Sequence, residues 1–306
     1  MSSSSAVGRF LDSDFVYSFT RSPVAVISSL VVVALVIAAV FASVLAPHNP
    51  FDLASLNLMD SFKPPVFMAD GDASYPLGTD DQGRDVLSGI MYGMQISLKV
   101  AILSIGFSLI VGISIGLLAG YAGGAIDSAL MRVVDVQLTF PSILIALLVD
   151  GIVRAVLPQS MQESLEIYVI VFAIGISRWP QFARTVRGST MVERGRDYVM
   201  AARVIGLSSV RIMITHILPN VLGPVLVIAT LNLGLAILDE ATLSFLGVGL
   251  PPTEPSLGTL IRIGNNFLFS GEWWITIFPG FTLAAIVLSI NLLGDWLRDA
   301  LNPRLR

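Results

Sequence analysis

The chain contains stretches of about 20 mostly apolar residues, the length that a helix needs to cross the hydrocarbon core of a bilayer. Because no water is available there to pair backbone N–H and C=O groups, such a stretch must be helical. The first stretch, residues 23–46, is longer than the apolar core of a cleavable signal peptide and follows about twenty polar or mixed residues. We therefore predict a retained membrane anchor.

Five further stretches of this kind follow, at residues 98–119, 129–149, 167–182, 221–238 and 274–293. Pro141 lies in the middle of the third span, which predicts a kinked helix. The second span carries three glycines on closely related helix faces, which predicts close packing against a neighbouring helix; they are Gly106, Gly112 and Gly116. The sequence thus predicts an all-α, polytopic membrane protein with six transmembrane helices.

Composition agrees with a membrane class and excludes several functions. Hydrophobic residues make up 54% of the chain and charged residues 13%, whereas about 25% of residues are charged in a soluble domain. The absence of cysteine excludes disulfides, thiolate catalysis and cysteine-ligated metal, and His48 and His216 have no second ligand at metal spacing. We predict no metal site, no catalytic residue and no nucleic-acid partner, and we expect that the chain is not an enzyme.

Arginine is distributed asymmetrically, and positively charged loops tend to remain cytoplasmic. Arginines precede the first span, crowd the segment between the fourth and fifth spans and follow the sixth span. We therefore expect both termini and the segment 184–220 to be cytoplasmic. The predicted organisation is a cytoplasmic segment at 1–22, a first transmembrane helix at 23–46, a periplasmic loop at 47–97, a five-helix core at 98–300 and a cytoplasmic tail at 301–306.

The cytoplasmic segment is too long for a simple helix connection of about 2–8 residues, so it must have structure of its own. The small residues Ala201 and Ala202 favour a short helix, and Gly206 is placed to end it with a positive φ. Ser208 can cap a second helix, which we expect to end at Pro219. The pattern predicts a compact helix-turn-helix at the membrane face, suited to the docking of another protein.

The same residues resemble the "EAA…G…I-LP" loop of binding-protein-dependent ABC importer permeases. Met200 stands where that family usually has glutamate, so an ion pair made by the glutamate is not available here. The resemblance implies a role in coupling to an ATPase for Ala201, Ala202, Arg203, Gly206, Leu207, Ile217 and Pro219.

Other segments resemble one subfamily, the C-type permease subunit of dipeptide and oligopeptide (peptide/nickel) ABC importers. They include residues 77–80, 83–88, 120–124, 140–141, 184–188, 243–247 and 291–306. The resemblance implies a type I ABC importer permease fold in the bacterial inner membrane. It also implies that the chain works with a second permease subunit, two cytoplasmic ATPase subunits and a periplasmic binding protein. The chain has no G-x-x-x-x-G-K-[ST] phosphate loop, so ATP and magnesium are expected on the ATPase partners.

Ionisable residues in or near the spans are candidate functional residues, because a charge in the bilayer is costly. Arg132 lies one helical turn before Asp135, so a local ion pair is an alternative explanation for both. Glu240 either has a function inside the membrane or lies at the outer interface. An alternative function is an ion-coupled secondary transporter or channel that uses Asp135, Asp239 and Glu240. That function predicts inverted repeats with broken helices, which the sequence does not show.

Arg84 and Asp85 lie in the predicted outer loop, and an arginine there would suit a substrate carboxylate. The surrounding Gly-Thr-Asp and Gly-Arg-Asp sequences favour a different interpretation. Such sequences form turns in which the side chains bond to their own backbone.

Overall fold

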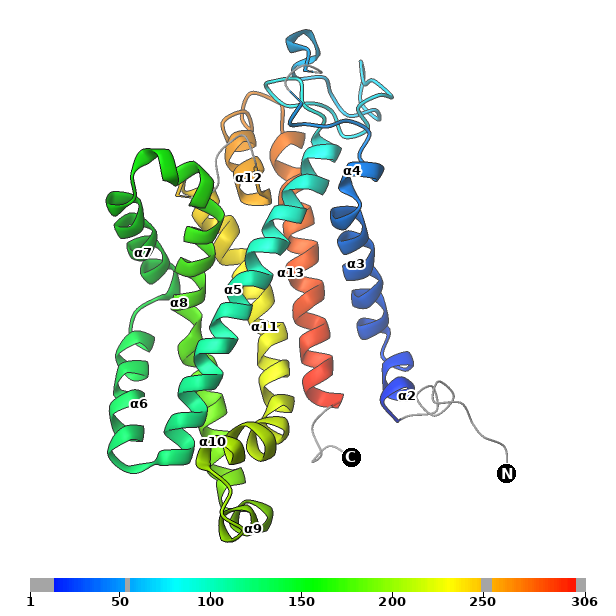
Figure 1. Cartoon of the computed structure of the whole chain (residues 1–306). Helices are drawn as coiled ribbons and strands as arrows, with labels where there is room; N and C mark the ends of the chain where they lie inside the picture. Colours follow the sequence, from blue (N-terminus) through cyan, green and yellow to red (C-terminus); the bar gives the residue numbers. More distant parts are fainter. Residues whose placement is uncertain (1–13, 53–55, 249–254, 301–306) are drawn as a thin grey trace.

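The computed structural model describes residues 14–52, 56–248 and 255–300, and these are helical apart from turns, loops and an isolated β-bridge. The long helices run along the length of the molecule in Figure 1 and are α3 (Pro23–Val40), α5 (Val86–Ala122), α8 (Gln159–Arg194), α11 (Leu218–Phe245) and α13 (Trp274–Ala300). Helix α5 packs along α8, α11 packs against both of them and against α13, and α3 packs against α13. The all-α prediction is confirmed.

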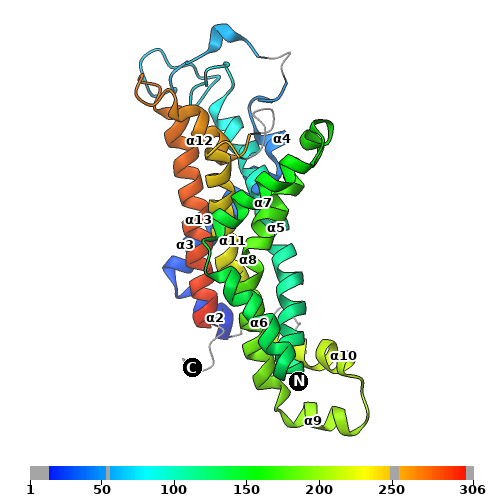
Figure 2. The ribbon, with the colours of Figure 1, turned by 90° about the vertical axis from the view of Figure 1, so that its left-hand side faces the viewer.

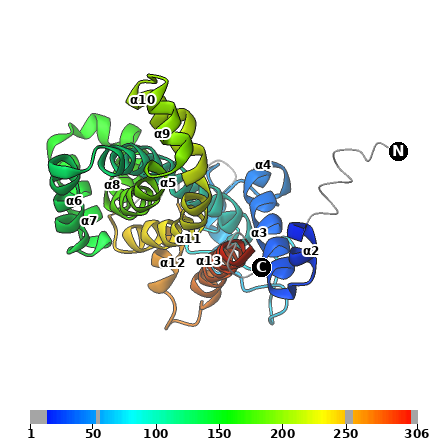
Figure 3. The same cartoon turned by 90° about the horizontal axis from the view of Figure 1, so that it is seen from below.

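The shorter elements are α2 (Asp14–Thr20), α4 (Ala42–Leu45), the 3-10 turn η1 (Leu58–Asp60), α6 (Gly124–Leu138), α7 (Ser142–Val156), α9 (Asp197–Val204), α10 (Ser209–Ile212), the π-helical segment η2 (Met213–Ile217) and α12 (Leu257–Asn265). Figure 1 shows α12 and residues 56–85 at one end of the molecule, which we name the α12 end. Helices α9 and α10 lie at the opposite end, the α9 end, together with α2 and the last turn of α13 (Figures 1 and 2). Seen from below, α9 and α10 project on the side away from α12 and α13 (Figure 3).

Length and apolar composition allow four helical stretches of the described chain to cross a membrane. They are α3, α5, the continuous stretch Ser209–Phe245 and α13, and the bent pair α6 and α7 makes a fifth if it is counted as one span. The predicted span at 167–182 lies within α8, which is not among them. The count of six is therefore not confirmed by these criteria, because polar residues such as Arg178 interrupt the apolar part of α8.

Helix α5 begins well before the predicted span at 98–119. The side chain of Asp85 accepts a hydrogen bond from the backbone N–H of Ser88 and caps the helix at Val86. The predicted periplasmic loop at 47–97 therefore contains the first turns of α5. The first turns of α5 pack against α12, so their residues need not be continuously apolar. A search for an apolar stretch therefore placed the start of this helix too late.

The predicted third span is two helices and not one kinked helix. Helices α6 and α7 meet at an angle of 93°, and Pro141 precedes the first turn of α7. Proline cannot donate a backbone hydrogen bond, and it disfavours helical geometry at the residue before it, Phe140. The helix therefore breaks at this point.

The helix that contains the predicted fourth span is longer than the span, because α8 continues through Pro180 to Arg194. Its second half is held by close packing against glycines of α5. A Cβ atom on Gly112 would lie 2.5 Å from the Cβ of Phe182, and one on Gly116 would lie 2.6 Å from the carbonyl oxygen of Ala183. Close packing is thus confirmed for these two glycines. The prediction of close packing is wrong for Gly106, where a Cβ atom would meet nothing within 4 Å.

Candidate coupling segment and intramembrane polar cluster

The chain passes from α8 to α11 through residues 195–217, which we name the connecting segment. Its first helix, α9, confirms the short helix predicted around Ala201. The second predicted helix does not end at Pro219, because α10 continues through η2 directly into α11. A proline ring clashes with the carbonyl four residues earlier in an α-helix, and the wider π turn just before Pro219 relieves that clash. Helices α8 and α11 take up the two ends of the predicted cytoplasmic segment 184–220.

Gly206 forms the turn between the two short helices. Its φ of +80° confirms the predicted left-handed conformation. The backbone N–H of Leu207 donates to the carbonyl of Ala202 at 3.1 Å and closes the end of α9. Ser208 precedes α10 as predicted, but its side chain makes no capping bond. A Cβ atom at position 206 would meet nothing within 4 Å, so this chain needs the glycine for backbone conformation and not for packing.

One face of α9 is anchored to the long helices. The hydroxyl of Tyr198 donates to Glu193 at the end of α8 at 2.7 Å, and the side-chain amide of Asn220 on α11 donates to the same hydroxyl at 3.2 Å. The guanidinium of Arg203 lies 5.0 Å from the ring centroid of Tyr121 at the end of α5. Val199 is fully buried on this face. The connecting segment is therefore tied to α5, α8 and α11.

The other face of the segment exposes apolar side chains. Val204 is 87% exposed and Ile205 is 74% exposed, and Met200 and Val210 are also exposed. Of these residues, Met200, Val204 and Ile205 lie outside the membrane-spanning stretches, and a cluster of exposed apolar side chains there marks an interaction site. Of the residues singled out by the resemblance, Ala202 and Ile217 are buried and Leu207 is half-buried, whereas the exposed ones are Ala201, Arg203, Gly206 and Pro219.

Arg178 connects α8 to α11 inside the bundle. Its Nε and Nη2 atoms donate to Oδ2 of Asp239 at 2.8 and 2.5 Å, and its Nη1 donates to Oδ1 of Asn232 at 3.2 Å. Nη2 also donates to the backbone carbonyl of Leu235 at 3.2 Å. Arg178 is buried, and a buried, paired charge of this kind is a functional candidate that the sequence alone did not single out. The signal was present, because a charged residue within an apolar window must find a partner.

Glu240 is fully buried within the helix bundle. Its carboxyl group accepts hydrogen bonds from the hydroxyls of Ser97 on α5 at 2.6 Å and Ser244 at 2.7 Å. The Ser97 oxygen in turn accepts a bond from the backbone N–H of Leu257 at the start of α12 at 3.3 Å. Glu240 therefore joins α11, α5 and α12.

Asp135 pairs with Arg184 of α8 at 2.6 Å, and the predicted pair of Asp135 with Arg132 is wrong. The reason is that α8 extends far enough to place Arg184 beside α6. Arg132 instead lines an open groove along α6 with Ser128, Val136 and other residues. A second α6–α8 pair, between Asp127 and Arg187 at 2.5 Å, was not predicted as an ion pair.

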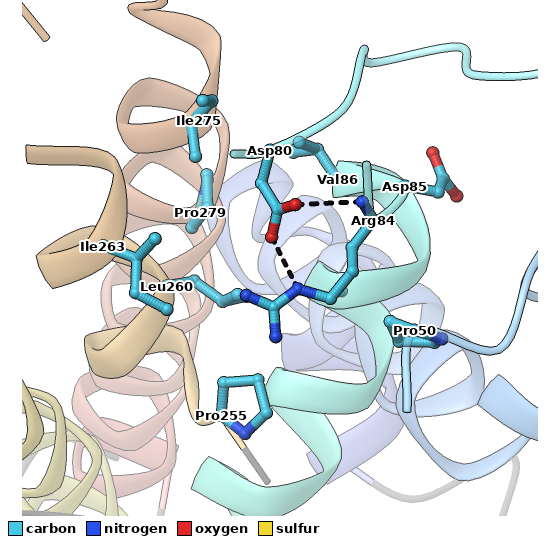
Figure 4. A pocket seen from close by; sticks show the side chains of 11 residues that line it. Pro50, Asp80, Arg84, Asp85, Val86, Pro255, Leu260, Ile263, Ile275 and Pro279 are labelled. Carbon is cyan, nitrogen blue, oxygen red and sulfur yellow. Dashed lines mark hydrogen bonds and ion pairs between the residues drawn. The ribbon is translucent and has the colours of Figure 1, made fainter. Parts of the chain in front are cut away.

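The bonds of Asp80 confirm the interpretation of the Gly-Thr-Asp and Gly-Arg-Asp sequences as a turn in which a side chain bonds to its own backbone. Oδ1 of Asp80 accepts from the backbone N–H groups of Gln82 at 2.8 Å and Arg84 at 2.9 Å, and its Oδ2 accepts from Nε of Arg84 at 2.7 Å. Figure 4 shows this pair above a cavity of about 20 Å³ between α5, α12 and α13. A cavity of that size holds about one water molecule and no peptide.

A family model described as "Binding-protein-dependent transport system inner membrane component" matches residues 112–306. A second, "N-terminal TM domain of oligopeptide transport permease C", matches residues 13–65. The chain belongs to this family of inner membrane transport components. The membership agrees with the membrane-spanning helices and makes the chain a multi-pass membrane protein.

Curated relatives in this family match nearly the whole chain. The chain is 41% identical to "Dipeptide transport system permease protein DppC" of Escherichia coli (strain K12), over 96% of this chain and 93% of the relative. It is 37% identical to "Di/tripeptide transport system permease protein DppC" of Pseudomonas aeruginosa (strain UCBPP-PA14), over 96% and 92%. It is 38% identical to the Haemophilus influenzae dipeptide permease protein DppC, over 86% of both chains.

A solved structure supports the fold of the family. The chain superposes on a chain of the MetNI methionine ABC transporter in an inward-facing conformation with a TM-score of 0.55. The match covers 70% of this chain and 96% of that chain at 18% identity. The predicted ABC importer permease fold is therefore confirmed.

Proposed function

We propose that this chain is the transmembrane permease subunit of an ATP-driven importer and forms, with a sister permease subunit, the path for peptides or peptide-like solutes. The observation that carries this proposal is the 41% identity to a dipeptide permease protein over 96% of the chain. A match of that extent includes the long helices, the connecting segment and the α12 end. The similarity therefore extends over nearly the whole chain and not over one shared domain.

Two cytoplasmic ATPase subunits supply the energy in this proposal, and one of them binds the connecting segment. The exposed apolar face around Val204 and Ile205 supports this assignment. The α9 end then faces the cytoplasm with both termini, and the α12 end receives solute from a periplasmic binding protein. ATP and magnesium bind the ATPase partners, because the sequence has no phosphate loop of its own.

The mechanism is alternating access. ATP binding brings the two ATPases together, and the connecting segment moves with the ATPase that holds it. Helices α8 and α11 continue from the two ends of this segment, so its displacement changes their tilt. Solute enters the cavity between the two permease subunits from outside and leaves inward after hydrolysis. Such a change needs two stable packings of rigid helices and no catalytic residue in this chain.

The ion-coupled alternative is not favoured. It requires acidic residues that are free to exchange a proton or cation. In the structure Asp239 is paired with Arg178 and Asp135 with Arg184. The third acidic residue, Glu240, is held by hydrogen bonds from Ser97 and Ser244. The solved structure that superposes on the chain is an ABC transporter.

Reconstitution tests the proposal. The chain is co-expressed with the sister permease, ATPase and binding-protein genes that flank its own gene, and the complex is placed in liposomes. Uptake of a labelled dipeptide is expected only with both ATP and the binding protein. A complex whose ATPase has lost its phosphate-loop lysine is the matched control. Uptake driven by an ion gradient without ATP, or ATP hydrolysis by the isolated chain, would contradict the proposal.

A further inference from the structure

Helices α8 and α11 form the two arms of a hairpin that is closed at one end by the connecting segment. Arg178 lies about 24 Å along α8 from Arg194, at about 1.5 Å per residue. Its bonds to α11 therefore join the two arms far from the turn that links them. A displacement applied at the turn reaches the far ends of both arms together only if the arms cannot slide past each other.

The bonds of Arg178 oppose such sliding. Its three guanidinium nitrogens donate hydrogen bonds to oxygens of Asn232, Leu235 and Asp239. These three residues lie on one face of α11 over about two turns. Asn232 is itself fixed, because its amide nitrogen donates to the carbonyl of Ile228 at 3.0 Å. Moving α8 along α11 would separate a buried charge from its partner, which costs far more than sliding one apolar side chain over another.

The residue after Asp239 extends the connection in another direction. Neighbouring residues of a helix point about 100° apart, so Glu240 faces α5 and α12 while Asp239 faces α8. Glu240 bonds Ser97 of α5, and Ser97 accepts from the N–H of Leu257 in α12. Two adjacent acidic residues of α11 thus join the α8–α11 hairpin to the elements of the α12 end.

We propose that Arg178 and Asp239 form a clamp that makes α8 and α11 move as one body and carries displacement of the connecting segment to the α12 end. Arg178 is a positioning residue and contacts no solute in this role. The inference rests on the proposed function, because it concerns how ATP use at the connecting segment reaches the solute path. It predicts that loss of the clamp uncouples hydrolysis from transport without preventing assembly.

The decisive variant replaces both partners with apolar residues, Arg178→Met together with Asp239→Leu. Exchanging a buried ion pair for apolar residues of similar size is often neutral for stability, so this variant is expected to fold where Asp239→Asn alone leaves a buried positive charge. The reconstituted complex is tested for thermal stability, binding-protein-stimulated ATPase activity and solute taken up per ATP hydrolysed. We expect near-normal stability and hydrolysis, with a clear loss of solute taken up per ATP hydrolysed. Asp239→Glu, which keeps the charge pair, should restore most of the coupling.

The matched control is Arg187→Met together with Asp127→Leu. This pair has the same chemistry on the same helix α8, but it joins α8 to α6 and not to α11. The control is expected to keep the wild-type ratio of solute to ATP. If the Arg178→Met, Asp239→Leu complex also keeps that ratio, the clamp does not exist. If the wild-type complex itself shows no ATP-dependent uptake, the proposed function fails instead, so the two failures are distinguishable.

Discussion

The two ends of the molecule satisfy their polar and apolar groups in different ways. At the α12 end, Asp80, Arg84 and Asp85 are all buried; Asp80 pairs with Arg84, and Asp85 accepts a hydrogen bond from the backbone N–H of Ser88. The indole N–H of Trp274 donates to the carbonyl of Thr79 at 3.0 Å and fixes this loop to α13. At the α9 end, the connecting segment leaves Val204 and Ile205 almost fully exposed.

This difference separates a charged turn that is held within its own chain from an apolar surface that, in the proposed function, an ATPase covers. A loop whose buried charges are paired internally keeps its shape alone. Exposed apolar side chains that cluster on a segment instead mark a surface where a partner can bind. The comparison holds for the charged turn and the connecting segment and not for the two whole ends, because Leu58 (74%) and Met59 (88%) are exposed at the α12 end.

The largest expected effect is at the α12 end, with Asp80→Asn. The neutral amide no longer balances the buried Arg84, and an unpaired buried charge costs about 3–5 kcal/mol. Thermal unfolding of the purified chain in detergent measures the loss. Asp70→Asn is the matched control in the same segment. Asp70 has a φ of +65°, a conformation that asparagine tolerates, so this substitution should change stability by less than about 0.5 kcal/mol. Equal stability of the two variants would show that the internal pairing at this end is unimportant.

A smaller effect is expected at the α9 end, with Gly206→Ala. The positive φ at this position costs an L-residue about 1 kcal/mol. Gly188→Ala is the control, because Gly188 lies within α8 with open space around it, and there alanine should stabilise by about 0.5–1 kcal/mol. Unfolding of the two variants in parallel should give changes of opposite sign.

The bulkier Gly206→Val tests the functional consequence at the same position. In the reconstituted complex it should abolish transport and either release the ATPase or remove its stimulation by loaded binding protein, with expression near normal. Wild-type transport and stimulation would mean that the turn at Gly206 is not part of the coupling element.

The smallest effect is a pH dependence at the α12 end. Hydrogen bonding from Lys63 lowers the pKa of Asp72 from 3.8 to about 2 and also lowers the pKa of Asp60, while the pKa of Lys63 is raised by the same two carboxylates. A lowered carboxyl pKa stabilises the fold above the unfolded value of 3.8, and this contribution is lost as the pH falls toward 2. The melting temperature of Lys63→Met should therefore fall less than that of the wild type between pH 5 and 2.5. If the melting temperatures of the two proteins fell equally over this pH range, Lys63 would not be the cause of the lowered carboxyl pKa values. These side chains are partly exposed, so the difference should be small.

The sequence predicted those features that depend on local chemistry. The apolar stretches, the positive φ at Gly206 and the self-bonded turn at Asp80 follow from residue types and spacing. Features that depend on a distant partner were missed. The apolar window ended the fourth span near Pro180, whereas packing of α8 on Gly112 and Gly116 continues the helix to its end at Arg194.

The sequence also did not predict which charged residues form ion pairs with each other. Spacing along one helix favoured a pair of Arg132 with Asp135, but the extension of α8 places Arg184 closer. In the same way the adjacent residues Asp239 and Glu240 looked alike, and only the packing shows that one faces α8 and the other faces α5. Helix geometry limits which residues share a face, and tertiary packing decides which of them meet.

Labelling of a single cysteine tests the central claim, that the connecting segment is the cytoplasmic surface that an ATPase covers. The chain has no cysteine of its own, so Ile205→Cys and Ala73→Cys each introduce one site. Intact cells, permeabilised cells and membranes stripped of ATPase are treated with a membrane-impermeant maleimide, in a complex whose other subunits carry no reactive cysteine. The account predicts that Ala73→Cys reacts from outside in every case. It predicts that Ile205→Cys reacts only after permeabilisation, and strongly only when the ATPase has been stripped away. Reaction of Ile205→Cys in intact cells, or equal reaction with and without the ATPase, would contradict the account.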